Sequence, residues 1–181
     1  RWVVKDNTGF TPEEAATLPV VLGTSVRAVK VVGEVKAGDH VLVTAGASGS
    51  GNMHIQVAKS LGAKVAATVR DDEKDAYVKS QGADLVINTR KEDVITRVRE
   101  WTGGRGADVA IDNVGGSELS KTIQAVRPFS IIVAYGFMSG AEATFNVRDL
   151  FFTQKQIRGT IFADPEDLEW GLEQVRLGRI N

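Results

Sequence analysis

The sequence predicts an α/β domain built on a doubly wound parallel sheet, and three observations support this fold class. Short apolar segments alternate with helical segments along most of the chain. The apolar segments lack a polar face, as strands do when helices cover both faces of a parallel sheet. Gly62, Gly82 and Gly103 follow three of the helical segments, where a left-handed C-cap is wanted. Right-handed crossovers between parallel strands then favour the doubly wound arrangement.

The individual elements follow in chain order. A helix starts at Thr11-Pro12-Glu13-Glu14, which combines a capping Thr, Pro at the first helical position and a Glu placed for a capping box. A second helical stretch is expected at 24–32 and a turn at 36–39. The predicted strands are His40–Thr44, Lys64–Val69, Asp84–Asn88, Asp108–Asp112, Ser130–Tyr135 and Ile157–Phe162. The predicted helices that alternate with them are Asn52–Leu61, Asp72–Gln81, Asp93–Thr102, Ser117–Val126, Val147–Lys155 and Pro165–Leu177.

Composition limits the function classes. The chain is 43% hydrophobic and 25% charged with a net charge of −1, and no basic stripe suggests nucleic acid or a membrane surface. No cysteine is present, which excludes disulfides and thiolate metal sites within this chain. We see no apolar run near the roughly 18 residues of a membrane span and no signal peptide. We therefore expect a cytoplasmic location and a small molecule as the partner.

The length suits a single domain over residues 1–181, in which 1–35 form a helical lead-in and 36–181 form the alternating core. The chain opens at Arg1 without Met and stops at Asn181 directly after a helical pattern. We therefore expect it to be a piece of a longer protein.

A glycine-rich turn follows the first predicted strand of the alternating series and precedes a helix. It reads Gly46-Ala47-Ser48-Gly49-Ser50-Gly51, in the context that a dinucleotide-binding fingerprint requires. Gly46 would allow the tight turn, and Gly51 would let the helix pack closely on the strand. Ser48 takes the place of the usual middle glycine and adds a hydroxyl. The free amides and the dipole of the helix start would hold a pyrophosphate, which favours dinucleotide binding over a purely structural turn.

Two other enzyme classes share such a turn. A methyltransferase would have an acid at the end of the second strand to hold ribose hydroxyls, and that place is taken by Val69. A short-chain dehydrogenase would have a Tyr-x-x-x-Lys pair, but Tyr77 is followed at that spacing by Gln81 and Tyr135 by Ser139. Both alternatives are disfavoured.

The residues after the second strand bear on the choice of dinucleotide. NAD-binding domains of this kind place an acid at the strand end, and Val69 stands there. Arg70 follows, and its planar fork suits a 2′-phosphate. Asp71 and Asp72 come next; they could cap the following helix, which we favour, or swing toward the ribose hydroxyls. This segment predicts NADPH over NADH.

The order of motifs along the chain resembles the cofactor domain of the medium-chain dehydrogenases/reductases, in the quinone oxidoreductase-like branch without zinc. The resemblance covers essentially all 181 residues. Its carriers are Glu14–Pro19, Ala45–Gly51, Gln56–Lys59, Gly82–Asn88, Thr102–Asp108 and Asp112–Gly116. It implies a Rossmann fold excised from a two-domain enzyme, whose missing barrel-like part supplies much of the substrate pocket.

The same resemblance assigns roles to individual residues. Thr24 matches the threonine beside the nicotinamide, Val114 the loop over the nicotinamide ribose, and Gly136-Phe137 the turn after the fifth strand. Lys74 resembles the lysine that phosphate-binding relatives place one helical turn after the strand. The expected cofactor-binding residues are Thr24, Gly46, Ala47, Ser48, Gly49, Ser50, Gly51, Arg70, Lys74, Val114, Tyr135, Gly136, Phe137 and Phe162.

Residues 158–162 resemble the last strand, which often pairs edge to edge across a homodimer. This chain departs from the family pattern at Ser50, where relatives often have valine, and at Thr89, where many have tyrosine. A gapless alignment through Thr24 places Val20 where zinc-dependent relatives have a cysteine ligand. Because an aliphatic side chain cannot coordinate Zn²⁺, we expect no zinc.

The remaining candidates have structural interpretations. We expect His54 at a helix surface or core edge and His40 in solvent. Asp112 could cap a nearby backbone donor or contact a ribose, and Tyr135 could approach the nicotinamide. No nucleophile–base pair or paired carboxylates stand out, so no catalytic residue is named.

The resemblance implies NADPH-dependent hydride transfer to a quinone, an activated alkene or a carbonyl. Within enzymes, the alternative is an enoyl-thioester or alkenal reductase of the same superfamily. Outside enzymes, the chain could serve as a dinucleotide-binding redox sensor without turnover.

Overall fold

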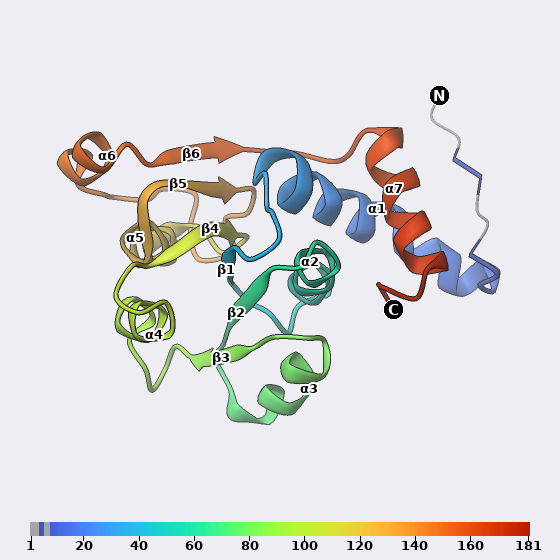
Figure 1. Ribbon diagram of the computed structural model, residues 1–181, viewed down its shortest axis with the longest axis horizontal. Coiled ribbons are helices and arrows are strands. Elements are labelled where there is room, and N and C mark those ends of the chain that lie inside the picture. Colours follow the sequence, from blue (N-terminus) through green and yellow to red (C-terminus); the bar gives the residue numbers. More distant parts are fainter. Residues whose placement is uncertain (1–3, 6–7) are drawn as a thin grey trace.

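A six-stranded parallel sheet forms the centre of the structure, a computed structural model that describes residues 4–5 and 8–181. The strand order is β3-β2-β1-β4-β5-β6, and every neighbouring pair is parallel (Figure 1). The chain enters the sheet at its middle, runs outward to β3 and then returns to β4, which confirms the doubly wound prediction. The strands are β1 (His40–Val43), β2 (Lys64–Val69), β3 (Leu85–Asn88), β4 (Ala107–Asp112), β5 (Val126–Ala134) and β6 (Gln156–Gly159).

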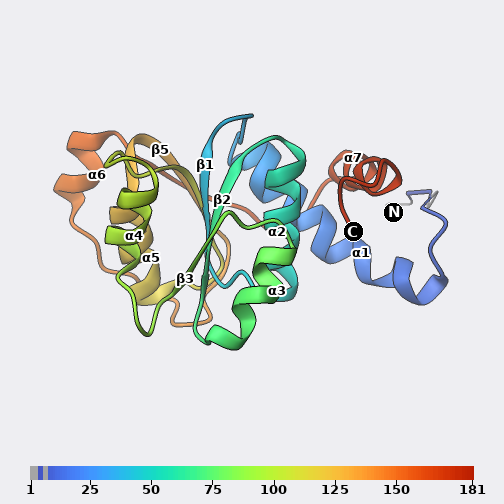
Figure 2. The same cartoon turned by 60° about the horizontal axis from the view of Figure 1, so that its bottom comes forward.

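Helices cover both faces of this sheet. Figure 2 shows α1, α2 and α3 on one side of the sheet and α4 and α5 on the other. The side chains of β1 alternate between the two cores, because Val41 and Val43 join the cluster under α1 and α2 while Leu42 joins the one under α4 and α5. The helices are α1 (Pro12–Val26), α2 (Gly49–Ser60), α3 (Asp75–Ser80), α4 (Val94–Trp101), α5 (Gly116–Ala125), α6 (Val147–Thr153) and α7 (Pro165–Arg176).

The first helix begins as predicted. Thr11 donates its backbone N–H to Oε2 of Glu14 over 2.9 Å, and the Glu14 N–H donates back to the Thr11 hydroxyl over 3.3 Å. The expectation of a separate second helix at 24–32 was wrong, because α1 continues directly into a π-helical segment, Arg27–Val32. Full burial of Leu22 and Val26 in the core carries the helix on past Pro19, a residue type that usually interrupts helices.

This continuity also corrects the expectation that no apolar run approaches a membrane span. The joined helix, Pro12–Val32, has 21 residues with a hydropathy of 1.4, and by length and composition alone it could cross a membrane. In the fold it packs against α2 and α7. The segment is 39% buried, and its buried side chains, such as Val29, belong to the core that covers the sheet.

Element ends differ from the predictions in two places that matter for the site. The strand expected at 157–162 ends at Gly159, so Ile161 and Phe162 lie outside the sheet. Phe162 has a left-handed backbone with φ 54°. A three-residue 3₁₀ turn, Asp72–Lys74, precedes α3 and occupies the start of the helix predicted at 72–81.

The C-terminal part of the chain packs back on the N-terminal helix. Arg27 donates to the carboxylates of Asp164 and Asp167, with 3.1 Å to the latter. Ile180 is almost fully buried in the core that includes Leu22. The backbone N–H of Asn181 donates to the side-chain carbonyl of Gln56 over 2.7 Å. Residues 164–181 therefore complete the layer formed by α1 and α2.

Candidate functional site

The glycine-rich turn lies at the carboxyl end of β1 and leads directly into α2. Ser48 is the N-cap of this helix, and its hydroxyl accepts the Gly51 N–H over 3.0 Å. Within the described part of the chain, the amides of Gly49 and Ser50 donate to no protein acceptor. They are the free N–H groups at a helix start that suit an anionic pyrophosphate.

Close packing explains two of the glycines. A Cβ on Gly51 would lie 2.1 Å from the carbonyl oxygen of Ala45, and one on Gly46 would lie 2.8 Å from the Cβ of Ala67. A Cβ on Gly49 would meet nothing within 4 Å, so the open side of the turn is at the helix start. The absence of a side chain at Gly46 fits its predicted role in the tight turn, while the residue with positive φ in this turn is Ala45, at 50°.

A side-chain network crosses the crevice between β1 and β4, where the strand order reverses. The Thr44 hydroxyl donates to Oδ1 of Asn113 over 3.1 Å and accepts the Asn113 N–H over the same distance. The Asn113 amide donates to the hydroxyl of Ser50 over 3.2 Å. A Cβ on Gly136 would lie 2.0 Å from the Asn113 carbonyl oxygen, so the turn after β5 packs on the same residue. Sequence reasoning missed Asn113, although it lies in the motif Asp112–Gly116.

His54 corrects a prediction, because it is fully buried and not at a surface or core edge. Its Nε2 is hydrogen-bonded to the Tyr135 hydroxyl, and burial lowers its pKa to about 3. Burial also raises the pKa of Tyr135, whose hydroxyl lies by Ser50 and Asn113. The imidazole is therefore neutral, and the Tyr135 hydroxyl is occupied by protein groups beneath the glycine-rich turn. A contact of Tyr135 with the nicotinamide stays a prediction.

Asp112, at the end of β4, takes the first of its two predicted roles. Its fully buried carboxylate accepts the backbone N–H groups of Val114 and Gly115 over 3.0 and 2.8 Å and the Thr122 hydroxyl over 2.7 Å. Because these donors occupy it, Asp112 fixes the turn that places Val114 above the crevice. His40 was expected in solvent, but its side chain is only 14% exposed.

The carboxyl end of β2 holds the residues expected at the adenosine ribose. Asp71 forms a salt bridge of 2.6 Å with Arg90, and Asp72 binds Lys91 and the side-chain amide of Asn88. The hydrogen bond from Lys91, followed by that from Asn88, holds the pKa of Asp72 below its usual value. The prediction that the acids cap the next helix was wrong, since no side-chain capping bond is made there.

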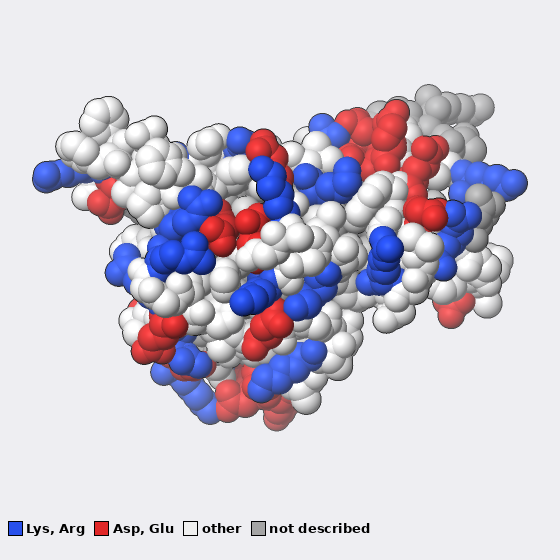
Figure 3. Space-filling view, in the orientation of Figure 1, with Lys and Arg blue, Asp and Glu red and all other residues white. Residues whose placement is uncertain are grey.

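Arg70 and Lys74 lie in the same loop and are exposed. The side chain of neither residue forms a hydrogen bond or ion pair within residues 4–5 and 8–181. Acidic and basic side chains are interspersed on the face of the molecule that Figure 3 shows. These two cations are therefore free to receive an anion.

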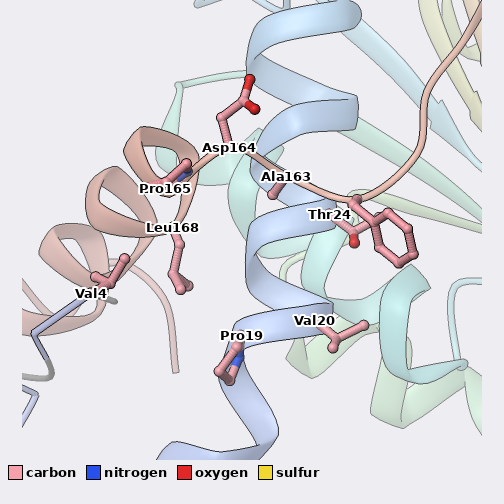
Figure 4. A pocket seen from close by; sticks show the side chains of 9 residues that line it. Val4, Pro19, Val20, Thr24, Ala163, Asp164, Pro165 and Leu168 are labelled. Atoms are coloured by element: carbon pink, nitrogen blue, oxygen red, sulfur yellow. The ribbon is translucent and has the colours of Figure 1, made fainter. Parts of the chain in front are cut away.

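A cavity of about 490 Å³ marks the other end of the expected site. Figure 4 shows its labelled residues on α1, on α7 and the segment that leads into it, and on the N-terminal arm. Phe162 lines it together with Thr24, the residue expected beside the nicotinamide, and the cofactor contacts of both stay predictions. Val20 lies in the same wall, and within the described residues no group of metal-ligating side chains could hold a metal ion. The full lining is Val4, Pro19, Val20, Thr24, Phe162, Ala163, Asp164, Pro165 and Leu168.

The fold thus brings the glycine-rich turn, Val114 and Gly136 together at the carboxyl ends of the strands. Phe137 follows this turn and is 73% exposed. Arg70 and Lys74 lie at the same end of the sheet, in the loop after β2. β6 pairs only with β5, so its outer edge is open within the described residues.

Comparisons with known proteins agree with this geometry. A family model described as zinc-binding dehydrogenase matches residues 49–176. The chain is 38% identical over 130 residues to the 2-haloacrylate reductase of Burkholderia sp, covering 71% of this chain and 38% of the relative. It is 33% identical over 134 residues to quinone oxidoreductase 1 of Escherichia coli (strain K12), covering 71% of this chain and 41% of that protein.

Among solved structures, the chain is similar to a 2-octenoyl-CoA carboxylase reductase in complex with NADP and 2-octenoyl-CoA. The TM-score is 0.89 at 27% identity, over 98% of this chain and 44% of the other. The chain spans about two fifths of the length of the two curated relatives, the 2-haloacrylate reductase and quinone oxidoreductase 1. The family match and both relatives lead to one conclusion: the chain belongs to the zinc-binding dehydrogenase family, within the medium-chain dehydrogenase/reductase superfamily and its quinone oxidoreductase-like part.

Proposed function

We propose that this chain binds NADPH and presents it for hydride transfer to an activated alkene, a quinone or a carbonyl. The observation that carries the proposal is the cradle between β1 and β4. There the unpaired amides of Gly49 and Ser50 lie beside a turn in which Gly51 allows no side chain. When bound, the nicotinamide supplies the hydride, and the protein supplies binding and orientation.

Different residues of this chain would bind different parts of the dinucleotide. The helix start at Gly49 holds the pyrophosphate, and Asn113 fixes Ser50 against the end of β4. Thr24 and Phe162 form the wall of the nicotinamide end. No side chain in this chain is assigned a proton transfer to substrate.

The preference for NADPH is supported by the loop after β2. Val69 leaves no carboxylate at the strand end, and the side chains of Arg70 and Lys74 form no hydrogen bond or ion pair with the described residues. A solved relative in this superfamily holds NADP. A charge-assisted hydrogen bond contributes roughly 1.5–3 kcal/mol, and about 1.4 kcal/mol is tenfold in affinity. We therefore expect Arg70→Ala to weaken NADPH binding about tenfold or more and to leave NADH binding nearly unchanged.

Titration of both dinucleotides into the full-length protein and the variant measures this difference. Lys36→Ala is a matched control, because Lys36 is an exposed cation in the turn before β1, at the opposite end of the sheet. Equal losses for the two dinucleotides in Arg70→Ala, or tighter binding of NADH by the unaltered protein, contradict the NADPH assignment.

An activated alkene is the substrate class with the most support. The names of two relatives, 2-haloacrylate reductase and 2-octenoyl-CoA carboxylase reductase, both describe alkenes conjugated to a carbonyl group. The E. coli relative is named for quinones instead. Rates of NADPH oxidation with an enone, an enoyl thioester and a quinone rank the three classes. Binding of NADPH without oxidation by any acceptor would favour the redox-sensor alternative.

We also propose that hydride transfer proceeds without zinc, in a cytoplasmic homodimer that pairs through β6. Val20 offers no ligand atom, and β6 has an open outer edge. Metal analysis of the active protein tests the first point, and one tightly bound zinc per active site, lost together with activity, contradicts it. Light scattering tests the second, because Ile157→Pro on β6 should produce monomers if this edge pairs.

A further inference from the structure

Two loops lie side by side at the carboxyl ends of β2 and β3. The strands are paired in register up to Val69 and Asn88, and the Thr89 N–H donates to the carbonyl oxygen of Val69 over 2.9 Å. The loop after β2 carries Arg70 to Lys74, and the loop after β3 carries Thr89 to Lys91. The residues that follow one strand therefore face those that follow the other.

Two ion pairs connect these loops. Arg90 Nη1 lies 2.6 Å from Oδ1 of Asp71, and Lys91 binds Asp72. Asn88 holds both partners in place, since its side chain is buried, accepts the Arg90 N–H over 3.0 Å and donates to Asp72. The buried side-chain amide of Asn88 thus helps to fix the position at which the loop after β3 forms its ion pairs with the loop after β2.

The pair between Arg90 and Asp71 has a consequence for cofactor choice. Asp71 is the first carboxylate after β2, the residue type that accepts bonds from both ribose hydroxyls in NAD-binding domains. A free carboxylate at this position repels a 2′-phosphate. While Arg90 holds it, and while Lys91 holds the exposed Asp72, the side chains of Arg70 and Lys74 remain without an ion pair among the described residues of this loop, next to the exposed acid Glu73.

We propose that Arg90 is a specificity-determining residue, which selects NADPH by holding Asp71 away from the ribose. This inference rests on the proposed binding of NADPH. Arg90 then acts through Asp71, and its loss frees a carboxylate that attracts the ribose hydroxyls of NADH and repels the phosphate of NADPH. The two side chains are 65% and 41% exposed, so the pair contributes little to stability and its removal leaves the fold intact.

The test is a set of titrations with NADPH and NADH on the full-length protein. Arg90→Gln should weaken NADPH about tenfold and strengthen NADH at least threefold. The double variant Arg90→Gln/Asp71→Asn removes both charges, so it should return both affinities to within about threefold of the unaltered protein. Lys91→Gln is the matched control, because Asp72 keeps its hydrogen bond from Asn88 and the ratio of affinities should stay the same.

Each outcome has one meaning. If NADPH weakens in Arg90→Gln while NADH is unchanged, and the double variant does not recover, Arg90 contacts the phosphate directly and the inference is overturned. If both dinucleotides weaken equally, Arg90 has only a structural role, which also overturns it. The unaltered protein decides the proposed function separately, since tighter binding of NADH there contradicts the NADPH assignment before any variant is compared.

Discussion

The buried imidazole of His54 leads to a quantitative prediction of how the free energy of unfolding falls in acid. His54 is fully buried in α2, and burial lowers its pKa from 6.5 to about 3. In the folded protein the ring therefore stays neutral down to about pH 3, whereas in the unfolded chain it takes a proton below pH 6.5. Because the unfolded state binds more protons in this window, His54 contributes its full stabilisation above pH 6.5 and loses it as the pH falls toward the folded pKa.

The magnitude follows from the shift. One pKa unit corresponds to about 1.4 kcal/mol, so lowering the pH from 6.5 to 5 should reduce the free energy of unfolding by about 2 kcal/mol through this residue. That is a large fraction of the roughly 5–15 kcal/mol that stabilises a typical domain.

Urea denaturation of the unaltered protein and His54→Gln at pH 7, 6 and 5 measures this effect. Glutamine can still accept a hydrogen bond from the Tyr135 hydroxyl but does not titrate, so the variant should lose about 2 kcal/mol less between pH 7 and pH 5. His40→Gln, which removes the other histidine, should retain the acid sensitivity due to His54. Equal losses in the unaltered protein and His54→Gln would refute the reasoning, since the buried imidazole would then not be the group that titrates.

Three further predictions concern the turns around the crevice. Gly51→Ala should abolish cofactor binding and lower the melting temperature, because its Cβ would lie 2.1 Å from the carbonyl oxygen of Ala45, whereas Gly49→Ala should fold normally and only weaken NADPH in the same titration. Asp112→Ala should lower the free energy of unfolding by about 3 kcal/mol or more in urea, since three donors lose their acceptor, and Asp112→Asn should lose less than half as much. Ala45→Gly should raise the melting temperature by about 1–4 °C, because it removes a left-handed alanine with φ 50°; a lower value would show that this turn is not strained.

The alternation of strands and helices was predictable because the strands β1 to β4 are short, mostly apolar segments that alternate with helical ones along the chain. Local signals also located the glycine-rich turn and the capping box at Thr11, since both depend on residues close together in the chain. The start of β5 was predicted four residues late, because its first part contains Pro128 and a break in register with β4.

Several of the predictions that failed depended on distant partners. The partners of Asp71 and Asp72 are 19 residues away, in the loop after β3, so local reasoning favoured capping. The burial of His54 depends on Tyr135, which is 81 residues further along the chain. Asn113 shows no function until β1 and β4 are placed side by side.

The packing of residues 164–181 on α1 determines when the domain can fold. Arg27 meets partners more than 130 residues later, and Ile180 fills the same core as Leu22. Contacts between such distant residues close only after long loops have been ordered, which slows folding. On the ribosome, the helix Pro12–Val32 therefore emerges long before α7, and its apolar surface stays uncovered until residues 164–181 have been synthesised.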